Sequence, residues 1–258
     1  MTNILVSDFV TTFLIFLRVA TLIFIAPVFG DKNFPVIAKL GLALVISYML
    51  FFTVQEYQFN YDQGLFGLGL IGAKEAITGM IMGFVLHFVF YGIGYAGTLI
   101  GFDMGLGMAQ MFDPSSEINN NMIGVFLSML SIVIFILIDG HHYVIQALAY
   151  SFRVIPIGVS TMNESVFQLI IKYSGSVFVL AVKIASPIMV SFFLLHVAAG
   201  IMARVIPQMQ VFFVLHPLKI GLGFLLLLMV LPMYVYVFKN LLMGYEDKLL
   251  ELVKAMSQ

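Results

Sequence analysis

The chain has 258 residues, of which 62% are hydrophobic and only 10% charged, and its formal net charge is −1. A soluble domain carries roughly 25% charged residues, so this composition excludes an ordinary water-soluble surface. The small net charge excludes a strong global field that would attract nucleic acid. Cysteine is absent, which excludes disulfides, thiolate metal sites and a cysteine nucleophile.

Long apolar runs follow one another along the chain. A helix needs about 20 apolar residues to cross the lipid core, and most of the runs approach or exceed that length. They are continuously apolar rather than alternating with a period of two, which argues against a membrane barrel. The runs are residues 9–29, 36–54, 64–102, 123–138, 166–206 and 218–243. We therefore expect an all-α integral membrane protein of long hydrophobic helices and helical hairpins, some kinked or broken, forming a single domain over residues 1–258.

The first run is predicted to be a retained span, because residues 1–8 contain no Lys or Arg and a cleavable signal has a basic start. The runs 64–102 and 166–206 could each be one long helix, two short spans or a broken helix. Pro187 predicts a kink in the second of them. The tail 244–258 mixes apolar and charged residues, which predicts a short amphipathic helix.

Glycine is concentrated in one part of the chain, since residues 64–107 hold 12 of the 22 glycines. Small residues four apart on a helix leave a groove that a second helix can approach closely. Gly79 and Gly83 have this spacing, and so do Gly97, Gly101 and Gly105. We expect these faces to be close helix contacts, either inside the chain or between subunits.

The segment that follows the glycine-rich run combines glycine with flexible apolar side chains. An exposed apolar loop is costly in water, so it must pack on something. Two interpretations remain open: a loop held on a neighbouring helix, and a deformable plug that closes a pore by excluding water. The residues that would form the plug are Gly105, Leu106, Gly107, Met108, Met111 and Phe112.

Several ionisable residues fall in or near the apolar runs. A charge at the centre of a span costs roughly 2.5–3.5 kcal/mol and usually finds a partner. Arg18 lies near the middle of the first run and is predicted to have a polar partner in the chain or in an assembly. We assign a buried polar or assembly role to the following set: Arg18, Lys74, Glu75, Asp139, Lys183 and Arg204.

Two adjacent histidines, His141 and His142, follow Asp139 and invite a metal-site interpretation. Histidines that share a metal on one helix are four residues apart, whereas adjacent side chains diverge. We therefore expect a polar cluster at a helix end and no metal site. The sequence contains no G-x-S-x-G, P-loop, H-E-x-x-H or dinucleotide motif, so we expect no catalytic residue and no cofactor.

Five segments, in the same order along the chain, resemble motifs of a known family. They are RVATLIFIAPVFGDKNFPVIAKLGLAL at 18–44, KEAITGMIMGF at 74–84, GTLIGFDMGLGMAQMFDPSS at 97–116, DGHH at 139–142 and ARVIPQMQVFFVLHPLKIGLG at 203–223. These motifs are similar to those of the FliR family, core subunits of the flagellar and type III secretion export gate. The resemblance spans nearly the whole chain.

The resemblance implies partners and a function. It implies one FliR copy assembled with several FliP-like and FliQ-like subunits, together with an FlhB-like subunit, in a hetero-oligomeric gate. Unfolded flagellar proteins would cross the bacterial inner membrane through this gate at the flagellar basal body. The N-terminal part would resemble a FliP protomer and roughly the C-terminal third a FliQ-like hairpin. The resemblance also places the plug of the closed channel in the glycine-rich loop.

Two other classes remain open from the residues alone. A small-solute or ion transporter could use Arg18, Lys183 and Asp139 as a coupling relay, although the sequence shows no matched pair of broken helices in two halves. An intramembrane enzyme would need a nucleophile and a base, and no such pair is recognisable. Co-purification with two smaller membrane subunits would favour the gate, and solute flux by the purified chain alone would favour the transporter.

Overall fold

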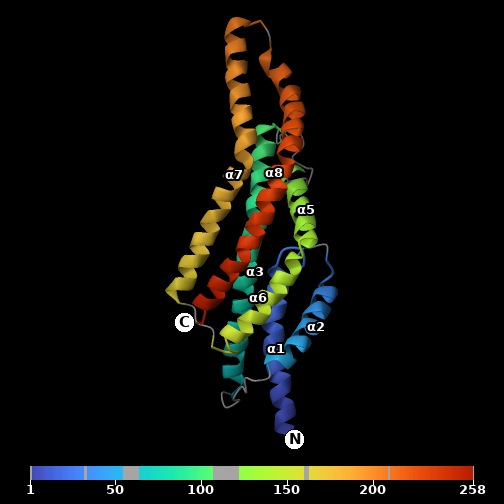
Figure 1. The fold of residues 1–258 in the computed structure, drawn as a ribbon, viewed down its shortest axis with the longest axis vertical. Coiled ribbons are helices and arrows are strands. Elements are labelled where there is room, and N and C mark those ends of the chain that lie inside the picture. The colour runs from blue at the N-terminus through green and yellow to red at the C-terminus, as the bar shows by residue number, and fades with distance from the viewer. Residues whose placement is uncertain are drawn as a thin grey trace. The chain divides into compact units, whose positions relative to one another are not determined.

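The computed structural model describes residues 2–31, 34–54, 64–106, 122–159, 163–208 and 210–257. Within these ranges the regular elements are all α-helices and no strand occurs, which confirms the all-α prediction. The helices are α1 (Thr2–Ile25), α2 (Val36–Val54), α3 (Gly64–Asp103), α5 (Met122–Leu137), α6 (Gly140–Val154), α7 (Glu164–Val205) and α8 (Val211–Ala255) (Figure 1).

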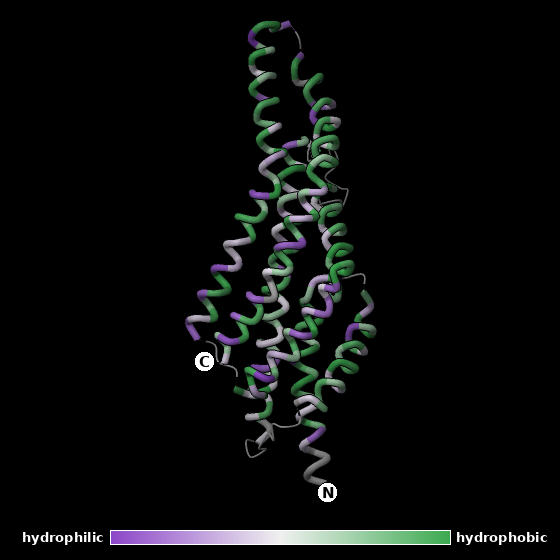
Figure 2. The backbone as a smooth tube through the Cα atoms, in the orientation of Figure 1, coloured by the Kyte–Doolittle hydropathy of each residue, from purple (hydrophilic) through white to green (hydrophobic). Residues whose placement is uncertain are grey.

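Five of the helices are long and apolar enough to cross a membrane. The candidate spans are Ser7–Ile25, Val36–Thr53, Phe66–Asp103, Glu164–Val205 and Phe213–Ala255, and α5 with α6 makes a sixth that is broken between them. Apolar residues predominate along most of the length of these helices (Figure 2). A helix satisfies its backbone hydrogen bonds internally, which is what the lipid core requires of a spanning segment.

The two longest apolar runs of the sequence each form one helix. α3 has 40 residues and α7 has 42, so neither run is a pair of short spans. α7 continues through Pro187 without ending. Proline removes only the backbone hydrogen bond to the carbonyl of Lys183, and that carbonyl accepts a hydrogen bond from the hydroxyl of Ser186 at 3.0 Å instead.

The predicted amphipathic helix of the tail 244–258 is present up to Ala255, but it is the end of α8 and not a short helix of its own. Gly244 costs roughly 1 kcal/mol of helix propensity, but it does not end the helix. The apolar face of the tail is buried at Leu249, Leu252 and Val253, and this burial offsets the cost of the glycine.

α6 is the helix that the sequence analysis missed, because Asp139 and Gly140 looked like the end of an apolar run. Its buried residues are spaced at i, i+3, i+4, i+7 and i+8, which is the pattern of a helix with one apolar face. These residues are Val144, Ala147, Leu148, Ser151 and Phe152. That pattern is present in the sequence and would have predicted the helix.

The chain divides into two compact units, each made of separate segments. The first unit contains Met1–Phe88, Asp139–Ser174 and Leu242–Gln258. Within it α1 packs along α2, and α2 also contacts α6. Its core includes Leu14, Ile15, Val19 and Leu22 on one face of α1.

The second unit contains Val89–Ile138 and Gly175–Leu241. Aromatic residues fill part of its interior: the ring of Phe90 meets the rings of Phe135 and Phe238 edge to face, with centroids 5.6 and 5.7 Å away. The buried hydroxyl of Tyr234 contacts Ser131 Oγ at 2.5 Å and donates to the carbonyl of Leu127 at 3.2 Å. These bonds fix α8 against α5 without leaving the phenol unpaired.

Asn163 joins two helix ends in the first unit. Its Oδ1 accepts a hydrogen bond from the backbone N–H of Val166 at 3.1 Å, which caps the start of α7. Its Nδ2 donates to the carbonyl of Ala255, the last residue of α8, at 3.0 Å. One side chain therefore satisfies a free donor of one helix and a free acceptor of another.

We expect Asn163→Ala to lower the free energy of unfolding by about 1–2 kcal/mol, because loss of an N-cap alone typically costs about 1 kcal/mol. The measurement is denaturation of the chain in mild detergent. Asn240→Ala is the matched control, since Asn240 is exposed on α8. Equal stabilities of the two variants would show that the double cap contributes nothing.

Candidate functional site

Arg18 is fully buried in the first unit, in the C-terminal half of α1. Its Nε donates to Glu75 Oε2 on α3 at 2.6 Å, and neither side chain is exposed. The expected polar partner of Arg18 is therefore Glu75 of the same chain. A charge-assisted bond of this length is among the stronger hydrogen bonds in proteins.

The rest of the Arg18 guanidinium faces the C-terminal end of α6. Nη1 donates to Ser151 Oγ at 3.2 Å, and both Nη atoms donate to the carbonyl of Ile155 at 3.2–3.3 Å. Arg18 Cζ also lies over the ring of Phe152, 4.1 Å from its centroid. Ile155 is the C-cap of α6, where the helix dipole is negative, so the cation is stabilised by the dipole as well as by Glu75.

The second carboxylate oxygen of Glu75 is also occupied. Oε1 accepts a hydrogen bond from the backbone N–H of Gly158 at 2.8 Å. The pair therefore connects α1, α3, the end of α6 and the segment 155–158. Removing one member of a buried ion pair leaves the other charge uncompensated, which typically costs 3–5 kcal/mol.

Glycines on α3 let α1 come close enough for this pair to form. A Cβ at Gly79 would clash with the carbonyl oxygen of Arg18 and with Thr21 Oγ1. A Cβ at Gly83 would lie 3.0 Å from the carbonyl oxygen of Leu22. Glu75 precedes Gly79 by four residues and therefore lies on the same face of α3, one turn away. The predicted close contact at Gly79 and Gly83 is thus a contact inside the chain.

A second close contact lies in the second unit, between α3 and α5. A Cβ at Gly97 would lie 2.5 Å from the Cα of Gly124, and a Cβ at Gly124 would lie 3.0 Å from the carbonyl oxygen of Gly94. Gly101 is also buried. Two backbones approach this closely only where neither helix carries a side chain at the contact.

Gly105 ends α3 rather than extending its glycine face. It has a φ of +80°, its N–H donates to the carbonyl of Phe102 at 3.0 Å, and the N–H of Leu106 donates to the carbonyl of Gly101 at 3.1 Å. These two bonds and the left-handed glycine form a Schellman C-cap. The ring of His216 packs against Gly105, and its Cε1 atom lies 2.8 Å from where a Cβ at Gly105 would be.

The remaining predicted site residues lie apart from this network. Four of the charged residues are exposed in the chain: Lys74, Asp139, Lys183 and Arg204. Their assignment to assembly contacts stays a prediction. Leu106 is half-buried, whereas Gly107, Met108, Met111 and Phe112 lie outside the described residues, so the plug assignment also stays a prediction.

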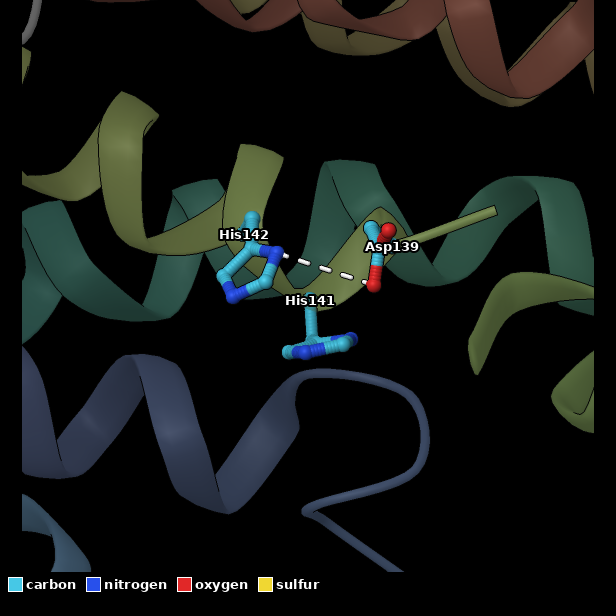
Figure 3. A group of neighbouring side chains, drawn as sticks. All are labelled: Asp139, His141 and His142. Atoms are coloured by element: carbon cyan, nitrogen blue, oxygen red, sulfur yellow. Dashed lines mark ion pairs between the residues drawn. The ribbon is translucent and has the colours of Figure 1, made fainter. Parts of the chain in front are cut away.

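Asp139, His141 and His142 lie together at the start of α6 (Figure 3). One potential ligand atom from each side chain lies within 4.8 Å of the other two. The two histidines are predicted from the sequence to diverge, yet their ring centroids are 4.3 Å apart.

Sequence reasoning missed three groups that complete the ion-pair network. Ser151 carried a usable signal, because it falls on the buried face of α6. The carbonyl of Ile155 and the N–H of Gly158 carried none, because every residue other than proline has both groups. Their role depends on the path of the chain after α6 and becomes visible only in the structure.

The fold and this network define a class: a multi-pass α-helical membrane protein in which one unit is held by a buried ion pair and both units contain close glycine contacts.

Residues 9–244 match the family described as Bacterial export proteins, family 1. The chain is similar to the flagellar biosynthetic protein FliR of Bacillus subtilis, with 28% identity over 92% of each chain. It is 29% identical to FliR of Escherichia coli over 84% of this chain and 82% of the relative. FliR of Caulobacter vibrioides is 30% identical over 83% and 85%. The chain belongs to the FliR family of bacterial export proteins.

We expect Glu75→Ala to lower the free energy of unfolding by about 3–5 kcal/mol, because it leaves the Arg18 guanidinium buried without its carboxylate. The double variant Arg18→Met with Glu75→Leu should recover much of this loss, since it removes both buried charges. Lys74→Ala is the control, because Lys74 is the exposed neighbour on the same helix. Denaturation in mild detergent measures all three variants, and a Glu75→Ala variant as stable as Lys74→Ala would contradict the central role of the pair.

Gly79→Ala should destabilise the chain by roughly 1–3 kcal/mol, because the added methyl overpacks the contact between α1 and α3. Gly69→Ala on the same helix has nothing within 4 Å of the added methyl. This control should be neutral or stabilising by up to about 1 kcal/mol, as is usual for glycine to alanine in an open helix position. The same denaturation assay compares them, and the idea fails if both variants shift stability in the same direction by the same amount.

Proposed function

We propose that this chain is a membrane subunit of a flagellar protein export gate. The observation that carries the proposal is its membership of the export family over residues 9–244. The relatives that it matches over most of their length are named flagellar biosynthetic protein FliR. Five to six candidate spans give the chain the multi-pass character that such a subunit needs.

The proposed role is gating and assembly rather than catalysis. The charged groups that the structure buries are occupied by packing contacts: Arg18 and Glu75 bind each other, and Lys39 donates to the carbonyl of Asp31 at 2.8 Å. A proton or solute relay needs groups that exchange partners. Arg18 instead makes a set of bonds that hold helices together, which favours the gate over the transporter.

The proposed partners are FliP-like and FliQ-like membrane subunits and an FlhB-like subunit, in the bacterial inner membrane at the basal body. Large apolar side chains remain exposed on α2, including Ile37, which is 85% exposed. Such a surface requires lipid or protein against it. α7 and α8 are long helices joined by only five residues, 206–210, and this connection supports a FliQ-like hairpin in the last third of the chain. We assign the N-terminal part to a FliP-like position.

The test of this function is the composition of the native complex. The chain, tagged at its C-terminus and extracted in mild detergent, should co-purify with two smaller membrane subunits in a complex of defined mass. Glu75→Ala should reduce the yield of that complex, and Lys74→Ala shows whether the exposed neighbour contributes to assembly. A chain that purifies alone and carries solute across liposomes would overturn the gate and favour the transporter.

The proposed plug yields a separate prediction. A protein-conducting pore must hold back ions when idle, and apolar side chains can close a constriction by excluding water. Deleting residues 107–112 keeps the Schellman cap at Gly105 and removes Met108, Met111 and Phe112. We expect this deletion to raise the resting ion conductance of the assembled gate in a planar bilayer while leaving assembly intact.

The matched control deletes six residues of the connection between α2 and α3, residues 55–60. This deletion should leave the conductance low. Native mass measurement of both complexes separates a leak from a failure to assemble. Unchanged resting conductance after removal of residues 107–112 would instead make this segment a packing element.

A further inference from the structure

The start of α6 gathers three side chains that are typical ligands of transition metals. We propose that Asp139, His141 and His142 form a binding site for a divalent transition-metal ion of the zinc class. This site is separate from the export function and does not depend on it. The three residues belong to one compact unit and to one continuous stretch of chain (Figure 3).

The backbone at Asp139 explains why neighbouring residues converge here. Asp139 has φ 58° and ψ 29°, in the left-handed region, and lies just before the first residue of α6. The N–H of His142 donates to the backbone carbonyl of Asp139 at 2.9 Å, which closes a tight turn. The expectation that these side chains diverge assumed one regular helix. Because Asp139 lies outside the helix, its carboxylate turns back over the first turn.

The distances suit a metal after small side-chain movements. All three ligand atoms lie within 4.8 Å of one another, and His142 Nδ1 is 3.7 Å from Asp139 Oδ1. Around tetrahedral zinc, with bonds of about 2.0–2.1 Å, ligand atoms are roughly 3.3 Å apart. The side chains of His142 and Asp139 are 62% and 71% exposed, so they can rotate to close the remaining difference, which is at most about 1.5 Å.

The Asp139 carboxylate has no competing role in the helix. It lies at the N-cap position of α6 but makes no side-chain capping bond. Its ion pair is with His142, the other proposed ligand. The carboxylate is therefore available to a cation without cost to the helix.

The ligand set decides the class of ion. Two imidazole nitrogens and one carboxylate oxygen suit zinc, cobalt, nickel and copper, whereas magnesium and calcium prefer oxygen ligands alone. Three protein ligands leave at least one coordination position to water, as in open zinc sites. A bound ion would join residue 139 to the first turn of α6 and stabilise the break before that helix.

The experiment uses the full chain in mild detergent, purified with an affinity tag that contains no histidine and stripped with a chelator. Calorimetric titration with Zn²⁺ should show one ion per chain, and Co²⁺ should develop the visible absorption of a nitrogen-ligated ion. Mg²⁺ should not compete. His142→Ala and Asp139→Asn should each weaken Zn²⁺ binding by about tenfold or more, since losing even a residue that only hydrogen-bonds to a ligand typically costs 10–100-fold.

Two comparisons keep the proposal falsifiable. His196→Ala removes another of the five histidines, from α7, and should retain the affinity of the unaltered chain. Asp139→Asn keeps the left-handed backbone, because asparagine tolerates that conformation. Its melting temperature in chelator should therefore match that of the unaltered chain, while Zn²⁺ should raise the melting temperature only when the three ligands are intact. Equal Zn²⁺ affinity in all variants, no saturable binding, or equal competition by Mg²⁺ would overturn the site.

Discussion

The buried pair of Arg18 and Glu75 is the interaction on which the rest of the first unit depends. A guanidinium at the centre of a span is costly unless its donors are satisfied, and here they require groups from separate elements. Glu75 comes from α3, while Ser151 and the carbonyl of Ile155 come from the end of α6. No single helix can compensate the charge alone. The pair therefore forces α1, α3 and α6 to be in place together, which makes the packing of this unit cooperative.

Close backbone contact is the condition that makes such a pair possible in a membrane protein. Lipid is as apolar as leucine, so helices associate through tight packing and polar bonds rather than through the hydrophobic effect. Gly79 brings the backbone of α1 against α3 one turn from Glu75. Gly97 and Gly124 do the same for α3 and α5 in the second unit, where no ion pair is involved. Close glycine contacts thus pack helices in both units. In the first unit, the ion pair also selects which helices pack together.

The sequence predicted those features that depend on residues close together along the chain. Long apolar runs gave the spans, and four-residue glycine spacing gave the contact at Gly79 and Gly83. The identity of the partner of Arg18 was not predictable, because several acidic residues were available and chain topology alone selects Glu75. α6 does not stand out as a fully apolar run, because this helix is apolar on one face only. The proposed metal site was not predicted, because a regular helix was assumed where the backbone is left-handed at Asp139.

The structure gives Gly105 a role that the sequence did not predict. By spacing it extends a helix-packing face, and by composition it belongs to a flexible plug. In the structure its positive φ and the paired bonds to Gly101 and Phe102 end α3, so Gly105 does not extend the helix-packing face, while its place in the plug stays a prediction. His216 packs where a side chain would lie, so Gly105 is held by the second unit itself. In the gate proposed above, the end of α3 at Gly105 would therefore be the anchor of the plug segment. Under that proposal only a short segment would need to move, because the bonds that end α3 belong to the packed helix and not to the plug.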